Sequence, residues 1–244
     1  MSYKKWLFIT GVALMIVLLF ACSKNEENPV TPTTPPKAPE FTLKPFAFPQ
    51  KMLQSADEMA KRALTIADEC LVFEGTGCIF AAPQGATAIK EETGQWEYQW
   101  VTGGLTQNLK ITAGGGRLTW QLFWNGTEGG QSYANWRKMD VVQRSDQTNG
   151  HVYVYKPATT QIALEWVWYT LDSGDYKFVK QWYDEPTGKI ELTFKEDKSG
   201  RLERFAPNSK GNLVYDLRIN WNSDGSGAWW TYHDGVQTGY GTWN

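Results

Sequence analysis

Few side chains in this 244-residue sequence have the types and the spacing that catalysis or metal binding requires. Neither His151 nor His233 has a second histidine or a cysteine at the spacing of a metal site. Glu97, Glu165 and Asp216 are each flanked by large apolar residues, but strand alternation would turn each carboxylate away from those neighbours and toward solvent. We therefore predict that the protein is not an enzyme and that it has no catalytic residues, no bound metal and no cofactor.

Two segments with glycines or oxygen ligands could belong to binding loops. The run Gly114-Gly115-Gly116 precedes an expected strand, so it lacks the helix N-terminus that would bind phosphate. The segment from Asn220 to Gly225 has the oxygen side chains and the glycine of the first half of a calcium loop, but Thr231 replaces the acidic residue that would complete it. We interpret both segments as hairpin turns, with calcium near Asn220–Asp224 as the alternative.

The aromatic residues give the strongest functional signal, because the chain has 13 Trp, 11 Tyr and 11 Phe. Trp229 directly precedes Trp230, so alternation places the two rings on opposite sides of one strand. We expect Trp230 to face the core with Tyr232, and Trp229 to face away. Four aromatic residues that break or oppose the alternation are candidate ligand-binding residues for a sugar ring or an acyl chain: Phe123, Tyr169, Tyr183 and Trp229. The alternative is that the helix and the N-terminal segment cover them.

One amphipathic helix and a long series of strands must position these side chains. Apolar residues recur at steps of three and four over residues 51–71, which predicts a helix that begins after Pro49 or at a capping box formed by Ser55 and Glu58. From Cys78 onward apolar residues alternate, and the connections are too short for crossover helices. We predict a mainly β fold of about 12 strands, either a curved antiparallel meander sheet or an up-and-down barrel, preceded by the helix.

Turn residues support this meander. The segments Glu185–Gly188 and Asp197–Gly200 each fit a type I turn that ends in a left-handed glycine. A three-residue loop at the first of these turns would pair Trp182 with Ile190 and Phe178 with Phe194, all on one face. The stretch from Tyr232 to Trp243 resembles one unit of MORN-type repeats, which implies a further hairpin.

The N-terminus has the features of an export signal. Lys4 and Lys5 precede an apolar run, Trp6 to Phe20, that is shorter than the ~20 residues of a membrane-spanning helix. The sequence Leu19-Phe20-Ala21-Cys22 resembles the lipobox of bacterial lipoproteins, and this resemblance implies cleavage before Cys22 and acylation of that cysteine. An uncleaved membrane anchor is the alternative. Ser23 resembles the residue found in lipoproteins sent to the outer membrane, where the protein would face the periplasm or the cell surface.

The chain accordingly divides into three parts: a signal peptide over residues 1–21, the lipidated cysteine with a Pro/Thr-rich tether over residues 22–50, and a single helix-plus-β-meander domain over residues 51–244. If Cys22 is acylated, Cys70 and Cys78 remain. An even number of cysteines in an oxidising compartment predicts a disulfide between them, with two buried thiols as the alternative.

Composition limits the partners. The formal net charge of −2 leaves no basic surplus for a nucleic acid. We predict an envelope lipoprotein that is held at the membrane by its lipid anchor and acts as a binding module for a hydrophobic or carbohydrate ligand. The alternative is a structural or interaction lipoprotein that contacts another envelope protein, whose identity the sequence does not indicate.

Overall fold

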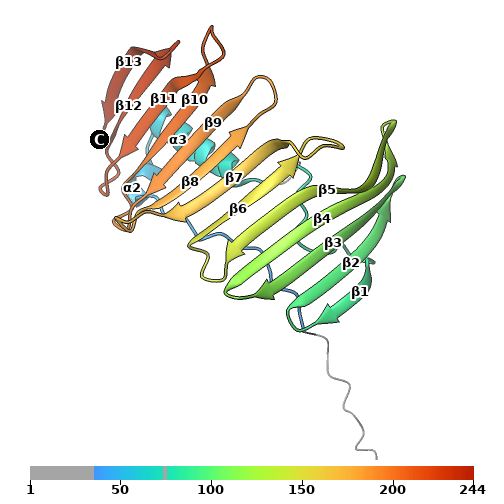
Figure 1. Ribbon diagram of the computed structural model, residues 1–244. Coiled ribbons are helices and arrows are strands. Elements are labelled where there is room, and N and C mark those ends of the chain that lie inside the picture. The colour runs from blue at the N-terminus through green and yellow to red at the C-terminus, as the bar shows by residue number, and fades with distance from the viewer. Residues whose placement is uncertain (1–35, 74–75) are drawn as a thin grey trace, which may run out of the picture. The chain divides into compact units, whose positions relative to one another are not determined.

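The computed structural model describes residues 36–73 and 76–244, and its main feature is one sheet of 13 strands. Every strand pairs antiparallel with the next one along the chain, and within the described residues β1 and β13 each have a single neighbour (Figure 1). The predicted antiparallel meander is therefore confirmed, as a sheet that is not closed into a barrel. Its strands are β1 (Thr87–Glu92), β2 (Gln95–Thr102), β3 (Leu105–Gly114), β4 (Arg117–Glu128), β5 (Gln131–Arg144), β6 (Asn149–Tyr155), β7 (Ile162–Thr170), β8 (Tyr176–Trp182), β9 (Gly188–Phe194), β10 (Gly200–Pro207), β11 (Leu213–Trp221), β12 (Gly227–His233) and β13 (Val236–Trp243).

Within the described residues two helices precede the sheet, where the sequence predicts one: α2 (Gln50–Leu53) follows Pro49, and α3 (Glu58–Leu71) follows after a short break. The cap of α3 is Asp57 rather than Ser55. The Asp57 carboxylate accepts hydrogen bonds from the backbone N–H groups of Met59 (2.8 Å) and Ala60 (3.1 Å), which would otherwise have no partner within the helix. The first turn of the longer helix is thus capped by Asp57, whose own backbone N–H donates to the Ser55 hydroxyl at 3.2 Å.

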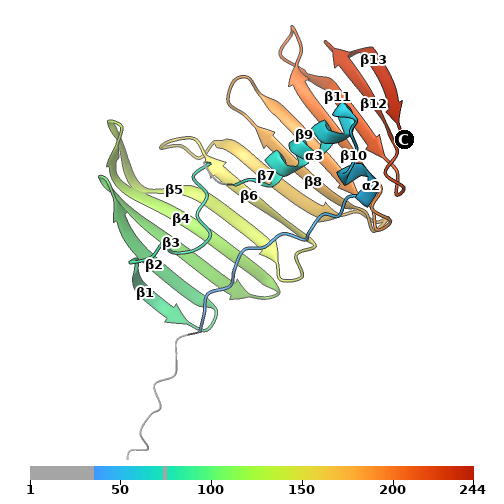
Figure 2. The same cartoon turned by 180° about the vertical axis from the view of Figure 1, so that it is seen from behind.

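Only one face of the sheet is covered by other described residues. Helix α3 lies across this face over the C-terminal half of the sheet, and the extended segment of residues 36–49 crosses the same face (Figure 2). The apolar stripe of α3 is buried against the strands through Ala60, Ala63, Ile66, Ala67 and Cys70. We call this side the covered face, and the side that points away from α3 the open face.

Residues 36–50, which the sequence analysis assigns to the tether, belong to the folded domain. The Phe41 ring meets the Trp120 ring edge-on at 5.6 Å, and the Phe46 ring stacks on that of Phe194 at 4.3 Å. Phe48 also contacts Phe194, at 5.4 Å. The tether prediction is wrong for this segment because its three phenylalanines bury apolar area on the sheet, although prolines surround them.

The predicted signal peptide, Cys22 and the first part of the tether lie outside the described residues. No described helix is long and apolar enough to cross a membrane. The longest one, α3, has 14 residues and is amphipathic.

Tryptophan rings lie over glycines on the covered face, at strand ends near the hairpin turns. A Cβ atom added to Gly200 would lie 2.3 Å from Cζ2 of Trp221, the residue directly opposite on β11. The indole N–H of Trp221 also donates to the carbonyl oxygen of Lys198 in the turn, at 2.9 Å. The same juxtaposition recurs in Gly150 with Trp168, Gly188 with Trp182, and Gly227 with Trp243.

This packing explains why the predicted turn register is off by two residues. Trp182 lies opposite Gly188 and Phe178 opposite Leu192, so the predicted face is right and the predicted partners are wrong. In the second turn the left-handed residue is Lys198, with φ of 69°, rather than Gly200. These glycines are required for the space that a tryptophan ring occupies, and not for their backbone freedom.

Candidate ligand-binding surface

The open face over β8 to β13 has two neighbouring features: a group of aromatic rings and a polar pocket. The strand register aligns Glu191, Glu203, Arg218, Trp230 and Tyr240 in one row across β9 to β13. All five side chains point away from α3, because they alternate with the buried residues of the same strands. This row connects the acidic side chains of the pocket to the aromatic rings.

Five rings form the C-terminal aromatic cluster, which consists of Phe205, Tyr215, Trp230, Tyr232 and Tyr240. Ring centroids lie 4.8 Å apart for Phe205 and Tyr215, 5.6 Å apart for Tyr215 and Tyr232, and 5.5 Å apart for Trp230 and Tyr240. The Tyr240 side chain is 57% exposed. Ring faces are therefore available on this side of the sheet.

Cations hold the cluster in place. The Arg218 guanidinium lies 4.7 Å from the centroid of the Tyr215 ring and donates to the Glu203 carboxylate at 3.1 Å. The ammonium group of Lys189 lies 4.2 Å from the Phe205 ring centroid. Such cation–π contacts restrict the aromatic side chains and reduce the entropy that they would lose on binding.

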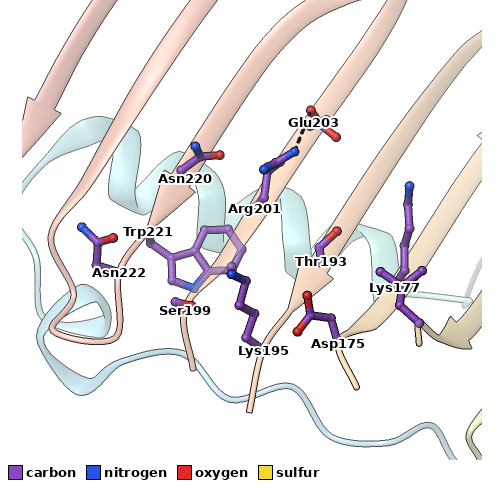
Figure 3. A pocket seen from close by; sticks show the side chains of 12 residues that line it. Asp175, Lys177, Thr193, Lys195, Ser199, Arg201, Glu203, Asn220, Trp221 and Asn222 are labelled. Carbon is purple, nitrogen blue, oxygen red and sulfur yellow. Dashed lines mark ion pairs between the residues drawn. The ribbon is translucent and has the colours of Figure 1, made fainter. Parts of the chain in front are cut away.

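A pocket of about 470 Å³ opens beside the cluster, across β8 to β11 (Figure 3). Side chains of four strands line it: Lys177, Thr193, Arg201, Glu203 and Asn220. Turn residues, among them Asp175, Lys195 and Asn222, complete its rim. Figure 3 shows Arg201 directed toward Glu203, at an ion-pair distance of 3.8 Å. The lining therefore offers several donors and acceptors within one small area.

Charges around the pocket largely compensate each other. The Glu191 carboxylate contacts the ammonium groups of Lys177 (2.6 Å) and Lys189 (2.7 Å). Burial alone would raise the pKa of Glu191, but the hydrogen bonds and charges of the two lysines outweigh it and hold the pKa below its ordinary value. Glu203 is buried and has Arg218 and Arg201 as partners. Such fixed, paired groups suit a polar ligand without a large net charge.

Asn220 gives this pocket an unused acceptor. Its Oδ1 atom is buried and has no hydrogen-bond partner among the described residues. Most buried polar atoms in proteins do have a partner, so a buried amide oxygen of this kind is a site for a donor from a ligand or water. The register places Asn220 between Arg201 on β10 and Ala228 on β12.

Three of the four predicted ligand-binding residues lie on the open face but belong neither to the aromatic cluster nor to the lining of the polar pocket, although Tyr169 lies opposite Lys177 of that lining. Phe123 on β4 has the Lys110 ammonium 5.8 Å from its ring centroid. Tyr169, at the end of β7, lines a second, shallow pocket of about 340 Å³. The Tyr183 hydroxyl donates to Glu165 at 2.9 Å; burial, followed by this hydrogen bond and the Glu165 charge, raises the pKa of Tyr183 to about 12. The structure does not bring these three together.

The predicted orientation of Trp229 is wrong. Trp229 lies opposite Ile219 on the covered face and packs against the core, whereas Trp230 lies opposite Arg218 on the open face. The prediction took the more aromatic side of β12 for the core side. In fact the open side of this strand has Trp230 and Tyr232, and the covered side has Gly227, Trp229 and Thr231.

Sequence reasoning also missed Tyr215, because it places Tyr215 and Leu217 on one face by alternation. A β-bulge follows Arg204 in the pairing of β10 with β11, so that Leu217 lies opposite Arg204 and Tyr215 lies opposite Phe205. The extra residue, Asp216, moves Tyr215 to the open face. Neighbouring residues give no clear signal for such a bulge.

Neither histidine forms part of a metal site. His151 stacks on Tyr153 on the open face, with ring centroids 4.1 Å apart, and burial lowers its pKa. His233 is exposed at the end of β12. Within residues 36–73 and 76–244, no three residues among His, Cys, Asp and Glu are grouped so that they could hold a metal ion.

The two segments interpreted as turns are hairpin turns. Gly115 and Gly116 have positive φ values between β3 and β4. Between β11 and β12, the Asp224 carboxylate accepts hydrogen bonds from the backbone N–H (2.9 Å) and the hydroxyl (2.7 Å) of Ser226. Asp224 is thus engaged in stabilising its own turn.

The predicted disulfide is not formed, since Cys70 and Cys78 are both free thiols. Each thiol has a different lysine nearby, Lys180 on β8 for Cys70 and Lys138 on β5 for Cys78. These strands are three positions apart, which corresponds to about 14 Å at the usual strand spacing. The chain after α3 continues across the sheet, so the second cysteine is carried away from the first.

The open face over β8 to β13 therefore combines exposed ring faces with a pocket of fixed polar groups. No family model and no curated protein matches this chain.

Proposed function

We propose that the protein is a non-catalytic binding module of the bacterial envelope, and that its ligand is a glycan lying across the open face. The observation that carries this proposal is the continuity of the C-terminal aromatic cluster with the polar pocket of Figure 3. A pyranose ring has an apolar C–H face and a rim of hydroxyl groups. The first packs on aromatic rings, and the second requires donors and acceptors at fixed positions.

The residues of the site match these two requirements. Trp230 and Tyr240 offer ring faces, while Arg201, Asn220 and Glu203 offer donors and acceptors one to three strands away. At a strand spacing of about 4.8 Å, this separation is about 5–15 Å, the length of one to three sugar rings. A short stretch of an oligosaccharide would therefore reach both features.

The packing of the covered face favours a glycan over an acyl chain as the ligand. Trp166, Trp168 and Phe178 are completely buried there, beneath α3 and the aromatic residues that precede it. An acyl chain would need an enclosed apolar cavity, and this part of the described core is filled by side chains instead. The aromatic residues that remain accessible to a ligand lie on the open face, and there they favour a sugar ring.

The proposal includes the location. Cys22 in the lipobox-like sequence would carry the lipid, and Ser23 favours the outer membrane as the destination. Since the folded domain begins by residue 36, the tether between the lipid and the domain would be residues 22–35. The domain would then stay close to the membrane surface, on its periplasmic or its external side.

Binding of purified envelope polysaccharides by the full-length protein in detergent tests the proposal. Tyr240→Ala and Trp230→Ala should each weaken binding by about fivefold or more, in line with ~1–3 kcal/mol for a lost stacking partner. Tyr133→Ala, at the far end of β5, is the matched control and should bind normally. Unchanged binding by both cluster variants would contradict the glycan proposal. Recovery of one envelope protein by cross-linking, without glycan binding, would favour the interaction role instead.

A further inference from the structure

A third pocket lies at the edge of the covered face, where the extended N-terminal segment passes the turns of the sheet. It has a volume of about 510 Å³. Apolar residues form its wall, with the Phe46 ring stacked on Phe194 at 4.3 Å. Four charged side chains surround it: Lys44, Lys195, Glu196 and Lys198. Lys195 lines this pocket and the pocket of the open face, and the other three belong to this one alone.

Tyr176 is one of the residues that line this pocket, and its hydroxyl group has no hydrogen-bond partner among the described residues. The residue is only 4% exposed, and its Oη atom is buried without a hydrogen bond to any described residue. Burial raises the pKa of Tyr176, so the hydroxyl remains a proton donor at neutral pH. A buried donor without an acceptor is unfavourable, and an acceptor supplied by a ligand would relieve this.

The charges nearby favour an anionic acceptor. The Lys44 ammonium lies 5.7 Å from the centroid of the Tyr176 ring. The three lysines exceed Glu196 by two positive charges, and the carboxylate of the neighbouring Asp197 is engaged by the backbone and the hydroxyl of Ser199. A phosphate monoester has a charge of about −1.5 to −2 at pH 7 and three acceptor oxygens, which complements this arrangement.

We propose that this pocket binds a phosphate monoester, whose oxygens accept from the Tyr176 hydroxyl and from Lys44, Lys195 and Lys198. The apolar wall would contact the organic part of the ligand. This site is separate from the aromatic cluster and shares only Lys195 with the polar pocket of the open face. The ligand is either a free phosphorylated compound or the headgroup of phosphatidic acid, which is itself a phosphate monoester.

Titration calorimetry of the full-length protein in detergent tests the proposal with four probes: inorganic phosphate, glucose 6-phosphate, glucose, and mixed micelles that contain phosphatidic acid. Glucose 6-phosphate should give a larger heat of binding than glucose, and Tyr176→Phe should reduce this phosphate-dependent difference. Binding of phosphatidic acid micelles alone would identify the headgroup as the source. Binding of none of the three phosphate probes would overturn the proposal.

Two variants separate recognition from folding. Tyr176→Phe removes one oxygen atom and should weaken binding about tenfold or more, the usual effect of losing a hydrogen bond to a charged group. Its melting temperature should equal or exceed that of the wild type, because an unpartnered hydroxyl is removed. Lys44→Gln should weaken binding as well, whereas Lys210→Gln, in an exposed turn, is the matched control. Unchanged affinity in Tyr176→Phe would show that the hydroxyl has no part in binding and would overturn the proposal.

Discussion

Gly200→Ala tests whether the packing of tryptophan over glycine holds the hairpins together. A Cβ atom at this position would lie 2.3 Å from Cζ2 of Trp221 and 2.5 Å from the carbonyl oxygen of Thr193. Neither neighbour moves easily, because Trp221 is only 2% exposed and the carbonyl belongs to the backbone of β9. Overpacking of this kind costs about 1–3 kcal/mol. At about 2–4 °C per kcal/mol for a domain of this size, the melting temperature should fall by roughly 2–12 °C.

Two further variants isolate the cause. Gly114→Ala is the matched control, since a Cβ atom there meets nothing within 4 Å. It should be neutral or stabilise the fold by about 0.4–1 kcal/mol, because alanine reduces the entropy of the unfolded chain. Trp221→Phe removes the indole atoms that a Cβ at position 200 would meet. In that background Gly200→Ala should cost less than in the wild type, with a coupling energy of about 0.5–3 kcal/mol.

Thermal melts and urea denaturation of all variants in one detergent give these energies. Equal stability of Gly200→Ala and Gly114→Ala would contradict the packing of tryptophan over glycine. An equal cost of Gly200→Ala with tryptophan and with phenylalanine at position 221 would contradict it as well. In either case the glycines would be required for another reason than the space beneath the indole ring.

Three other predictions follow from the faces and charges of the sheet. Trp229→Ala should lower the melting temperature more than Trp230→Ala, because only the first ring packs against the core; equal losses would contradict the face assignment. Burial raises the pKa of Cys70 to about 12 and that of Cys78 to about 11, so alkylation of the native protein should be slow at mildly alkaline pH. After unfolding without a reductant, both cysteines should be alkylated. A cysteine that mass spectrometry finds unalkylated would reveal a disulfide. Glu191→Gln should destabilise the protein at neutral pH. Since folding lowers the pKa of Glu191 from 4.5, the carboxylate stabilises the fold fully above that pH and loses its effect as the pH falls through the lower folded value. The difference in the free energy of unfolding between the variant and the wild type, measured by urea denaturation, should therefore shrink in acid. A difference that stays constant would contradict the ion pairs.

The strand pattern could be predicted because alternation has a simple physical cause. A strand that is covered on one side buries every second residue, and β7 shows this with Trp166 and Trp168 at 0% exposure. The same rule located β8 through Phe178, and short connections between the strands required sequential antiparallel pairing. The open edges were not predictable in this way, because closure depends on the accumulated twist and not on any one strand.

The location of the site was less predictable than the strands, for two physical reasons. First, the bulge at Asp216 turns Tyr215 to the open face, and a bulge shifts all alternation beyond it. Second, three phenylalanines in a proline-rich stretch supply part of the cover, so the helix is not the sole cover of the sheet. Because this stretch was assigned to the tether, and its role as a cover was only an alternative, the aromatic residues of the two faces could not be told apart.

The distribution of aromatic residues over the two faces is itself an argument for binding on the open one. On the covered face, rings such as Trp168 are accounted for by the layer that packs on them. On the open face, no described segment covers Trp230 or Tyr240, and the latter is more than half exposed. Contiguous exposed apolar surface on a protein is generally small and often marks a binding site. Because Arg218 connects these rings to the buried carboxylate of Glu203, a ligand on the rings and a ligand in the pocket would contact one continuous and already ordered surface.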